Sequence, residues 1–358
     1  MKIFDAISEY GHEQVVLCHD QATNLRAVIA IHNTILGPAL GGCRMWPFES
    51  EEEAIFDVMR LSRGMTYKNA AAGLNLGGGK AVIIGDPNKD KSEALFRAFG
   101  RFVQSLGGRF ITAEDVGTSV EDMEQIKMET RYVAGLPEEF GGSGDPSSFT
   151  ALGVFEGIRA SVKYRLKRDS LKGIKVAVQG AGHVGYYLCE LLQEAGADLI
   201  ISDIFEDKAD RVVSDFGAKA VKGNEIYEVD AEVFAPCALG AIVNDDTIKR
   251  MKFSIIAGGA NNQLLDENIH GKKLKEKNIL YAPDYLINAG GVTNVFFEVI
   301  NEYSRDRVTK KVKNIYNILM EVYRISESDK ITTVEAAAHL AEKRLNLIRH
   351  VHQNYLQK

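Results

Sequence analysis

The sequence predicts an α/β protein of two domains, and three observations indicate this fold class. The 358 residues are enough for two hydrophobic cores. Strand-like apolar runs alternate with helix-like periodic segments along most of the chain. Residues 136–150, LPEEFGGSGDPSSFT, concentrate Gly, Pro and Ser and indicate a connector. We therefore expect a first domain over 1–135, with 331–358 packing back on it, and a second domain over 136–330.

The first third of the chain mixes strands and helices. The runs 14–20, QVVLCHD, and 25–33, LRAVIAIHN, predict two strands joined by a polar turn. Ser50 and Glu53 have the spacing of a capping box, and apolar residues at helical spacing follow them. Lys68 is expected at or just past the end of this helix.

The next elements lead from Lys80 to Asp115. We expect the three glycines before Lys80 to form a turn and the following AVIIGDP to form a strand. A helix over 93–106 and the strand RFIT come next, and Thr118 with Glu121 predicts another helix start. The two lysines and the aspartate then all lie at element ends, where reactive side chains often protrude from rigid supports.

The second half predicts a more regular alternation of strands and helices. A helix over 151–164 leads into a βαβ unit over 174–204, and the last helices cover 305–328 and 332–356. Three further strand-like segments are AEVFAPCA, FSIIAGGAN and NILYAPDY. This order favours a parallel sheet in the second domain.

The turn of the βαβ unit fits the GxGxxG pattern in the right context. It follows the strand KVAVQ, opens a helix, and is followed by Asp203 at the end of the next strand. The helix N-terminus would hold a pyrophosphate, and Asp203 would accept hydrogen bonds from ribose hydroxyls, which favours NAD over NADP. His183 occupies a variable position and is interpreted as incidental to catalysis. The motif consists of Gly180, Ala181, Gly182, His183, Val184 and Gly185.

Composition excludes several other classes of protein. A net charge of −6 argues against nucleic acid or anionic membranes as main partners. The chain has no apolar run of the roughly 20 residues that span a bilayer, and its N-terminus lacks a signal-peptide core. The four cysteines are scattered without a CxxC pair, so we predict reduced core thiols, a cytoplasmic location and no metal site.

The segment 64–80, GMTYKNAAAGLNLGGGK, has two possible interpretations. Lys80 beside a glycine turn could be a proton-transfer group, or it could be a buried structural lysine. A phosphate-binding P-loop is excluded, because Leu74 replaces its first glycine and Ala81 its hydroxyl residue. The segment alone leaves the first two interpretations open.

Six longer motifs resemble the amino-acid dehydrogenases that act on leucine, valine and phenylalanine, which are relatives of glutamate dehydrogenase. These motifs are LGPALGGCRMWPF, GMTYKNAAAGLNLGGGK, ITAEDVGT, FAPCALG, GGANNQ and YAPDYLINAGGVTNV. The resemblance covers nearly the whole chain. It implies an N-terminal substrate domain, a Rossmann domain, a closing cleft between them, and NAD-dependent oxidative deamination.

The resemblance also assigns roles to individual residues. Lys68 matches the lysine that binds the substrate carboxylate, and Lys80 the lysine that activates water for attack on an iminium intermediate. Asp115 matches the carboxylate that handles protons on the substrate nitrogen. Lys68 as a neighbouring cation and burial beside the glycines would both favour a neutral Lys80 amine. The other implied positions are Leu40, Gly41, Gly42, Met65, Ala113, Asn262, Val292 and Val295 for substrate, and Thr150, Cys237, Ala238 and Asn261 for the cofactor.

The implied substrate is a branched aliphatic amino acid, with leucine first. Ala113 and Val292 match the aliphatic-specific members, whereas aromatic-specific members tend to carry glycine and leucine there. GGCRM and GDPSSFTALGVF are closer to the phenylalanine enzymes, so a phenylalanine or tryptophan dehydrogenase is the alternative. Phe296 would shrink the pocket if it turns inward, whereas Phe296 and Phe297 would bear on assembly if they face another subunit. A non-catalytic NAD-binding regulator is a distant possibility, and the family implies a homo-oligomer, often an octamer.

Overall fold

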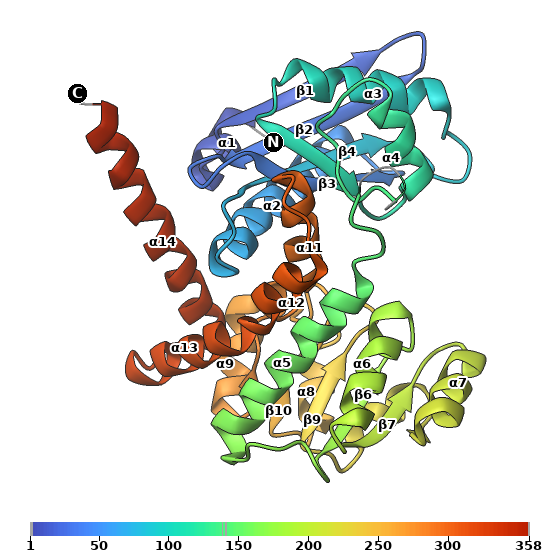
Figure 1. Cartoon of the computed structure of the whole chain (residues 1–358), viewed down its shortest axis with the longest axis vertical. Coiled ribbons are helices and arrows are strands. Elements are labelled where there is room, and N and C mark those ends of the chain that lie inside the picture. Colours follow the sequence, from blue (N-terminus) through green and yellow to red (C-terminus); the bar gives the residue numbers. More distant parts are fainter. Residues whose placement is uncertain (1–2, 138, 140–141, 357–358) are drawn as a thin grey trace. The chain divides into compact units, whose positions relative to one another are not determined.

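The computed structural model describes residues 3–137, 139 and 142–356 of the chain (Figure 1). It divides into two compact units. Unit 1 consists of residues 1–145, 295–303 and 341–358, and unit 2 of residues 146–294 and 304–340. The predicted connector at 136–150 includes positions 138, 140 and 141, which lie outside the described residues.

Unit 1 is built on a mixed five-stranded sheet in the order β1-β2-β4-β3-β5. The two strands predicted first are antiparallel neighbours, β2 pairs antiparallel with β4, and β3 runs parallel to both β4 and β5. The strands are β1 (Gln14–Asp20), β2 (Leu25–Asn33), β3 (Ala39–Trp46), β4 (Gly77–Ile84) and β5 (Phe110–Glu114).

Helices cover both faces of this sheet. The helices that precede residue 130 are α1 (Ile3–Tyr10), α2 (Glu51–Ala71), α3 (Glu93–Ser105) and α4 (Val120–Lys127). Val28 and Val82 pack with Val58 of α2, whereas the alternate positions Ile29 and Ile83 belong to the core that contains α3. Because successive strand residues point to opposite faces, even-numbered positions of β2, β3 and β4 face α2.

The three glycines before Lys80 are strand residues, so their prediction as a turn was wrong. A β-carbon on Gly77 would lie 2.0 Å from the carbonyl oxygen of Asn33, and one on Gly78 would lie 2.1 Å from Thr66 Oγ1. A β-carbon on Gly79 would lie 2.6 Å from the Phe110 ring. Glycine is therefore required here for close packing on both faces of a central strand, and Lys80 lies inside β4 rather than at its end.

Two other details of unit 1 differ from the sequence prediction. Strand β3 was not predicted from the residues, because Gly41 and Gly42 interrupt its apolar pattern. Helix α4 is capped by Ser119, whose side chain pairs reciprocally with Asp122, one residue after the predicted Thr118 start. The predicted helix cap at Ser50 is confirmed, since its side chain accepts from the backbone N–H of Glu53.

Unit 2 is a six-stranded, all-parallel sheet in the order β11-β10-β9-β6-β7-β8. The strands are β6 (Lys175–Gln179), β7 (Asp198–Ser202), β8 (Lys219–Ala220), β9 (Val233–Pro236), β10 (Ile255–Ile256) and β11 (Leu280–Tyr281). The predicted βαβ unit is confirmed as β6, α6 (His183–Glu194) and β7. This is a Rossmann-like sheet, as the sequence predicts.

The helices predicted over 151–164, 305–328 and 332–356 are confirmed, whereas α7 to α11 had no predicted bounds. Helix α5 begins four residues before the expected Ala151, and the stretch predicted over 305–328 is two helices divided near Asn314. These helices are α5 (Ser147–Leu166), α7 (Glu206–Phe216), α8 (Asp245–Arg250), α9 (Glu267–Glu276), α10 (Asp284–Ile287), α11 (Gly290–Val299), α12 (Arg305–Lys313), α13 (Ile315–Ser328) and α14 (Thr333–Leu356), with a 3₁₀ helix η2 over Gly223–Glu228. Within the described part of the chain, no helix is long and apolar enough to cross a membrane.

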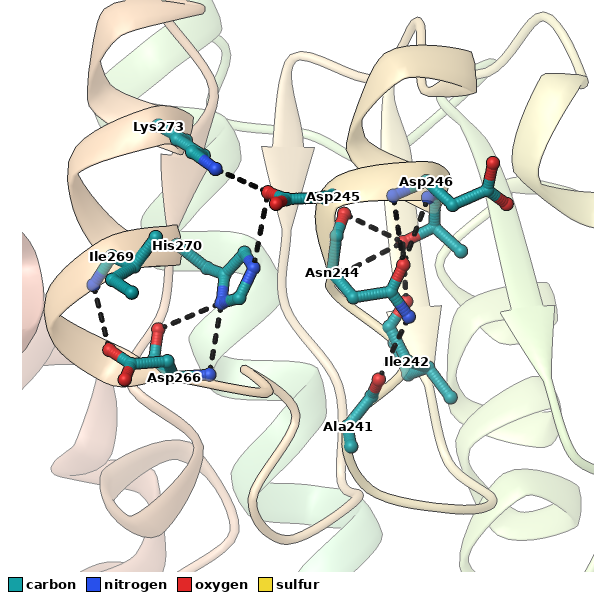
Figure 2. A network of polar contacts seen from close by, with 10 residues as sticks. Ala241, Ile242, Asn244, Asp245, Asp246, Asp266, Ile269, His270 and Lys273 are labelled. Carbon is teal, nitrogen blue, oxygen red and sulfur yellow. Dashed lines mark hydrogen bonds and ion pairs between the residues drawn. The ribbon is translucent and has the colours of Figure 1, made fainter.

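Polar contacts fix α8 to α9 in unit 2 (Figure 2). Asp245 accepts from Lys273 and lies 3.4 Å from His270 Nε2. Asn244 caps α8 by accepting from the N–H groups of Asp246 and Thr247, both at 3.1 Å. These contacts give the short helices after β9 and β10 a defined position against each other.

Candidate active site

The core of the candidate site is an ion pair between Lys80 and Asp115. Lys80 Nζ lies 2.8 Å from Asp115 Oδ1, and the side chains are 7% and 22% exposed. Lys80 comes from β4 and Asp115 follows β5, while β3 lies between these two strands. Side chains from the two strands that flank β3 can make contact only if β3 carries small residues between them.

Gly41 and Gly42 leave that room on β3. A β-carbon on Gly42 would lie 2.8 Å from that of Asp115 and 2.5 Å from the Glu114 carbonyl oxygen. One on Gly41 would lie 1.7 Å from the carbonyl oxygen of Gly79. The glycine pair therefore lets β4 and the end of β5 approach each other closely.

Helix α2 lies over the same face of the sheet and carries Met65 and Lys68. Both side chains are half-buried, and their spacing of three residues places them on one side of the helix. Thr66, between them, lies directly against Gly78, which is two residues before Lys80. The structure therefore brings the last turns of α2 over the strand that carries Lys80.

Arg344 fixes the end of α2. Its guanidinium donates from Nη1 to the carbonyl oxygens of Ala70 at 3.1 Å and Leu74 at 2.7 Å, and from Nη2 to Asn75 Oδ1 at 2.7 Å. Burial lowers the pKa of this guanidinium from its usual value. A cation on the last carbonyls of a helix is a favourable cap. Through it, residues of α14 support the segment that connects Lys68 to Lys80.

Leu40 and Ala113 lie on the same face as Lys80. Leu40 is buried, Ala113 is half-buried, and a β-carbon on Gly135 would lie 4.0 Å from that of Ala113. Glu298 of α11 accepts from the backbone N–H of Gly135 at 3.0 Å and from Ser143 Oγ at 2.6 Å. The wall beside Ala113 is thus held by a carboxylate on α11.

The charges around Asp115 favour its ionised form. Burial raises its pKa, but Lys80 and Arg44 oppose this effect, and the net result is a pKa below the usual value. Glu114, the next residue, has a raised pKa because of burial and of the nearby carboxylates, including Asp145. Burial also raises the pKa of the Cys43 thiol beneath them, so Cys43 stays protonated.

The remaining cysteines are also poor nucleophiles. Burial raises the pKa of Cys18 to about 12 and that of Cys237 to about 11, and it raises the pKa of Cys189 further. All four are free thiols. Cys18, Cys43 and Cys189 are buried, as expected of core residues, whereas Cys237 is half-buried.

Unit 2 brings its predicted cofactor positions to one edge of the sheet. Gly180, Asp203, Cys237 and Asn261 follow β6, β7, β9 and β10, so they share the edge formed by the carboxyl ends of the strands. A β-carbon on Gly180 would lie 2.9 Å from that of Ala238. The crevice outside this edge is where open α/β sheets bind ligands.

The glycine loop fits a dinucleotide. Gly180 has φ +100° and Gly182 has open space where a β-carbon would stand. A β-carbon on Gly185 would lie 1.9 Å from the Gly180 carbonyl oxygen, so the start of α6 packs closely on the turn. Among the described side chains, none caps α6 at Gly182, and the positive end of a helix dipole favours a phosphate at such a position. His183 and Val184 form the first turn of this helix.

Asp203 supports the same loop. Its Oδ2 accepts from the backbone N–H of Ala181 at 2.6 Å, and its Oδ1 accepts from that of Phe205 at 2.9 Å. The sequence predicts only ribose contacts for this residue. The carboxylate therefore orients the glycine loop as well as presenting its charge at the sheet edge.

The other predicted positions of unit 2 lie near this edge. Asn261 and Asn262 are exposed, Asn262 has φ +50°, and Asn288 donates to Asn261 Oδ1 at 2.6 Å. Thr150 is in the first turn of α5, and a β-carbon on Gly291 would lie 2.7 Å from its Oγ1. Val292 is half-buried in the first turn of α11.

Val295, on the same helix, belongs to unit 1. It is half-buried, and the next two residues, Phe296 and Phe297, are 9% and 7% exposed. Their rings meet edge to face with centroids 5.3 Å apart. Both rings are therefore packing residues of this structure.

Sequence reasoning missed Arg44, whose guanidinium contacts Asp115. Arg44 Nε donates to Asp115 Oδ2 at 3.0 Å and Nη1 to Asp57 Oδ2 at 2.8 Å. The available signal was its position two residues after Gly42, which places it on the same face of an extended strand. That signal depended on recognising β3.

Family models match nearly the whole chain. One described as Glu/Leu/Phe/Val dehydrogenase, dimerisation domain, matches residues 12–132. Another, described as Glutamate/Leucine/Phenylalanine/Valine dehydrogenase, matches residues 141–205 and 201–352.

Individual relatives agree with these models. The chain is 57% identical to a leucine dehydrogenase from Thermoactinomyces intermedius, over 100% of the chain and 97% of that protein. It is 52% identical to a phenylalanine dehydrogenase from Caldalkalibacillus thermarum, over 96% of the chain and 93% of that protein. The crystal structure of L-tryptophan dehydrogenase from Nostoc punctiforme superimposes with a TM-score of 0.88 at 48% identity, covering 97% of the chain and 99% of that structure.

Proposed function

Because this chain belongs to the Glu/Leu/Phe/Val dehydrogenase family, we propose that it oxidatively deaminates L-leucine and other branched-chain amino acids with NAD. The reaction converts the amino acid, NAD⁺ and water into a 2-oxo acid, ammonia, NADH and a proton, and it is reversible. The 2.8 Å pair of Lys80 with Asp115 carries this proposal, since it joins a potential proton donor and a potential proton acceptor.

Each charged residue has a separate task in the proposed reaction. Lys68 binds the substrate carboxylate as a point positive charge. Asp115 takes a proton from the substrate amino group, and after oxidation at Cα, Lys80 removes a proton from the water that attacks the iminium carbon. Lys80 passes this proton to solvent and then takes the hydroxyl proton of the resulting carbinolamine, while Asp115 returns a proton to its nitrogen, so that the C–N bond breaks, the C=O bond forms and ammonia leaves.

The family and the Rossmann-like sheet imply a nicotinamide cofactor, which accepts the hydride from the substrate Cα when bound. The glycine loop would hold its pyrophosphate, with Thr150, Ala238 and Asn261 at the same sheet edge. We infer NAD rather than NADP, because the Asp203 carboxylate would repel a 2′-phosphate.

The pocket residues favour an aliphatic side chain. Leu40, Ala113 and Val295 of unit 1 and Val292 of unit 2 are apolar, and the family resemblance assigns all four to the substrate side chain, where the Ala113 methyl group would occupy space that an aromatic ring needs. One methylene changes discrimination by only about 1–3 kcal/mol, so leucine, valine and isoleucine should all react. An aromatic amino acid is the second candidate, supported by 52% identity to a phenylalanine dehydrogenase.

We further expect a homo-oligomer, since one matching model is described as a dimerisation domain. The family resemblance suggests an octamer, and the four reduced thiols suit a cytoplasmic protein.

A substrate panel tests the proposed function. The purified protein would be assayed for NADH or NADPH formation with leucine, valine, isoleucine, phenylalanine, tryptophan and glutamate. We expect leucine with NAD to give the highest kcat/KM. A tenfold preference for phenylalanine or tryptophan would replace the proposed substrate, and no turnover with any amino acid would support the non-catalytic NAD-binding regulator.

A further inference from the structure

Asp115 is held by cations on both of its carboxylate oxygens. Oδ1 faces Lys80 Nζ at 2.8 Å and Oδ2 accepts from Arg44 Nε at 3.0 Å. Its backbone is fixed as well, since its N–H donates to Thr118 Oγ1 at 2.9 Å and that hydroxyl donates to the Cys43 carbonyl oxygen at 2.8 Å. The carboxylate therefore has one defined orientation.

Arg44 is itself held in place from the opposite side. Its Nη1 donates to Asp57 Oδ2 at 2.8 Å, and Asp57 Oδ1 accepts from Arg60 Nη2 at 3.1 Å. The side chains of Arg44 and Asp57 are only 22% and 15% exposed, whereas that of Arg60 is 46% exposed. A planar guanidinium can bridge two carboxylates in this way, and a lysine ammonium cannot reproduce its geometry.

The two cations on Asp115 differ chemically. In the proposed reaction Lys80 gains and loses a proton, whereas a guanidinium stays charged at every pH of enzymatic interest. If Lys80 were the sole partner, the Asp115 carboxylate would lose its counterion at the step in which Lys80 is neutral. Arg44 removes this dependence, because it supplies a permanent charge to the second oxygen.

Several other groups around Asp115 act in the opposite direction. Glu114 is adjacent to Asp115, and Asp145 and Glu121 lie near Glu114. Like charges favour protonation of a carboxylate. Burial of Asp115 also favours its protonated form, and Lys80 and Arg44 are the cations that oppose this effect.

We propose that Arg44 is a positioning residue of the reaction, which orients the Asp115 carboxylate and keeps it ionised whatever the protonation state of Lys80. This role rests on the proposed function, since it assumes that Asp115 accepts a proton from the substrate. Asp57 contributes to the same role, because its hydrogen bond holds the Arg44 guanidinium against Asp115.

The pH dependence of kcat for leucine deamination tests this role in Arg44→Gln, Arg44→Lys and Asp57→Asn variants. In Arg44→Gln, kcat should fall roughly tenfold to a hundredfold, and the acidic limb of the profile should move up by about one pH unit. The KM for leucine should stay within about threefold, because Lys68 is untouched. In Arg44→Lys the acidic limb should lie between its positions in the wild type and in Arg44→Gln. In Asp57→Asn, kcat should fall and the acidic limb should move up by less than in Arg44→Gln.

Two control variants separate this role from general effects. Arg60→Gln removes the other partner of Asp57 and should keep the wild-type profile, and Glu114→Gln tests whether the acidic limb belongs to the neighbouring carboxylate. The proposal would be overturned if Arg44→Gln had a lower melting temperature but an acidic limb of the kcat profile at the wild-type pH. It would also be overturned if the acidic limb disappeared in Glu114→Gln. Should Arg44→Gln not fold, the Arg44→Lys profile decides on the same criterion. If the wild-type protein itself does not oxidise leucine, the proposed function fails instead.

Discussion

Gly42 and Asp115 are so close that a β-carbon on Gly42 would lie 2.8 Å from the β-carbon of Asp115. This contact explains why β3 carries a glycine at this position, where an ordinary strand would carry a β-branched residue. Lys80 and Asp115 can form their ion pair because β3 has no side chain at Gly42, which lies between them.

Gly42→Ala should therefore damage catalysis more than folding. The added methyl group must displace Asp115 or the Glu114 carbonyl group, and kcat for leucine should fall by roughly a hundredfold. Overpacking should also lower the free energy of unfolding by about 1–3 kcal/mol. Steady-state kinetics and urea unfolding measure the two effects. Gly64→Ala is the matched control, because its β-carbon meets nothing within 4 Å on α2, and it should keep wild-type kcat.

Ala113→Gly should shift substrate preference toward aromatic amino acids. Removal of this methyl group enlarges the pocket beside Gly135, so the ratio of kcat/KM for phenylalanine to that for leucine should rise by about tenfold. The measurement is a two-substrate comparison on the same enzyme preparation. An unchanged ratio would mean that Ala113 does not border the substrate side chain.

Asp203→Asn should reduce discrimination between NAD and NADP. Asparagine keeps an oxygen acceptor for the Ala181 N–H but removes the negative charge, so the ratio of kcat/KM for NAD to that for NADP should fall about tenfold. Asp203→Ala would also release the glycine loop, and it should weaken both cofactors. If the ratio of kcat/KM for NAD to that for NADP were the same in the wild type and in Asp203→Asn, another residue would determine the preference for NAD.

His32 should make the protein less stable in mild acid. Burial chiefly, with His12 and Arg63 nearby, lowers the pKa of His32 to about 4, below its usual 6.5. Between these two pH values the unfolded chain binds a proton at His32 that the folded chain does not bind. The free energy of unfolding therefore has its full value above pH 6.5 and falls as the pH drops toward 4.

The expected loss from this one group is about 2–3 kcal/mol across that pH window. Urea unfolding at several pH values measures it. His32→Gln should flatten the slope, although it also loses the 2.7 Å bond to Thr66 Oγ1 and starts less stable. His19→Gln, at an exposed position of β1, should keep the wild-type slope. Equal slopes in wild type and His32→Gln would contradict the assignment.

Local patterns in the sequence predicted much of the fold. The bounds of β1 and β2, the Ser50 cap and the βαβ unit all follow from apolar periodicity and turn chemistry within a few residues. The capping box of α14 is likewise confirmed, with Thr332 and Glu335 exchanging hydrogen bonds at 2.7 and 3.2 Å. Each of these features is decided by residues close together in the chain.

The features that the sequence did not predict correctly share one cause, because they depend on packing between segments that are distant in the chain. Gly77 to Gly79 resemble a turn in isolation, and only Thr66 and Phe110 on the two faces of β4 explain their presence in a strand. Strand β3 was missed for the same reason. Arg44 then had no expected position relative to Asp115, which lies 71 residues further along the chain.

Lys80 is proposed to activate the attacking water, and replacing this lysine with alanine tests that role. Leucine-dependent NADH formation would be compared between the wild-type protein and Lys80→Ala, with Lys89→Ala, an exposed surface lysine, as control. We predict that kcat falls by a factor of about 10³ in Lys80→Ala and is unchanged in Lys89→Ala. Wild-type turnover by a folded Lys80→Ala protein would contradict the role proposed for Lys80.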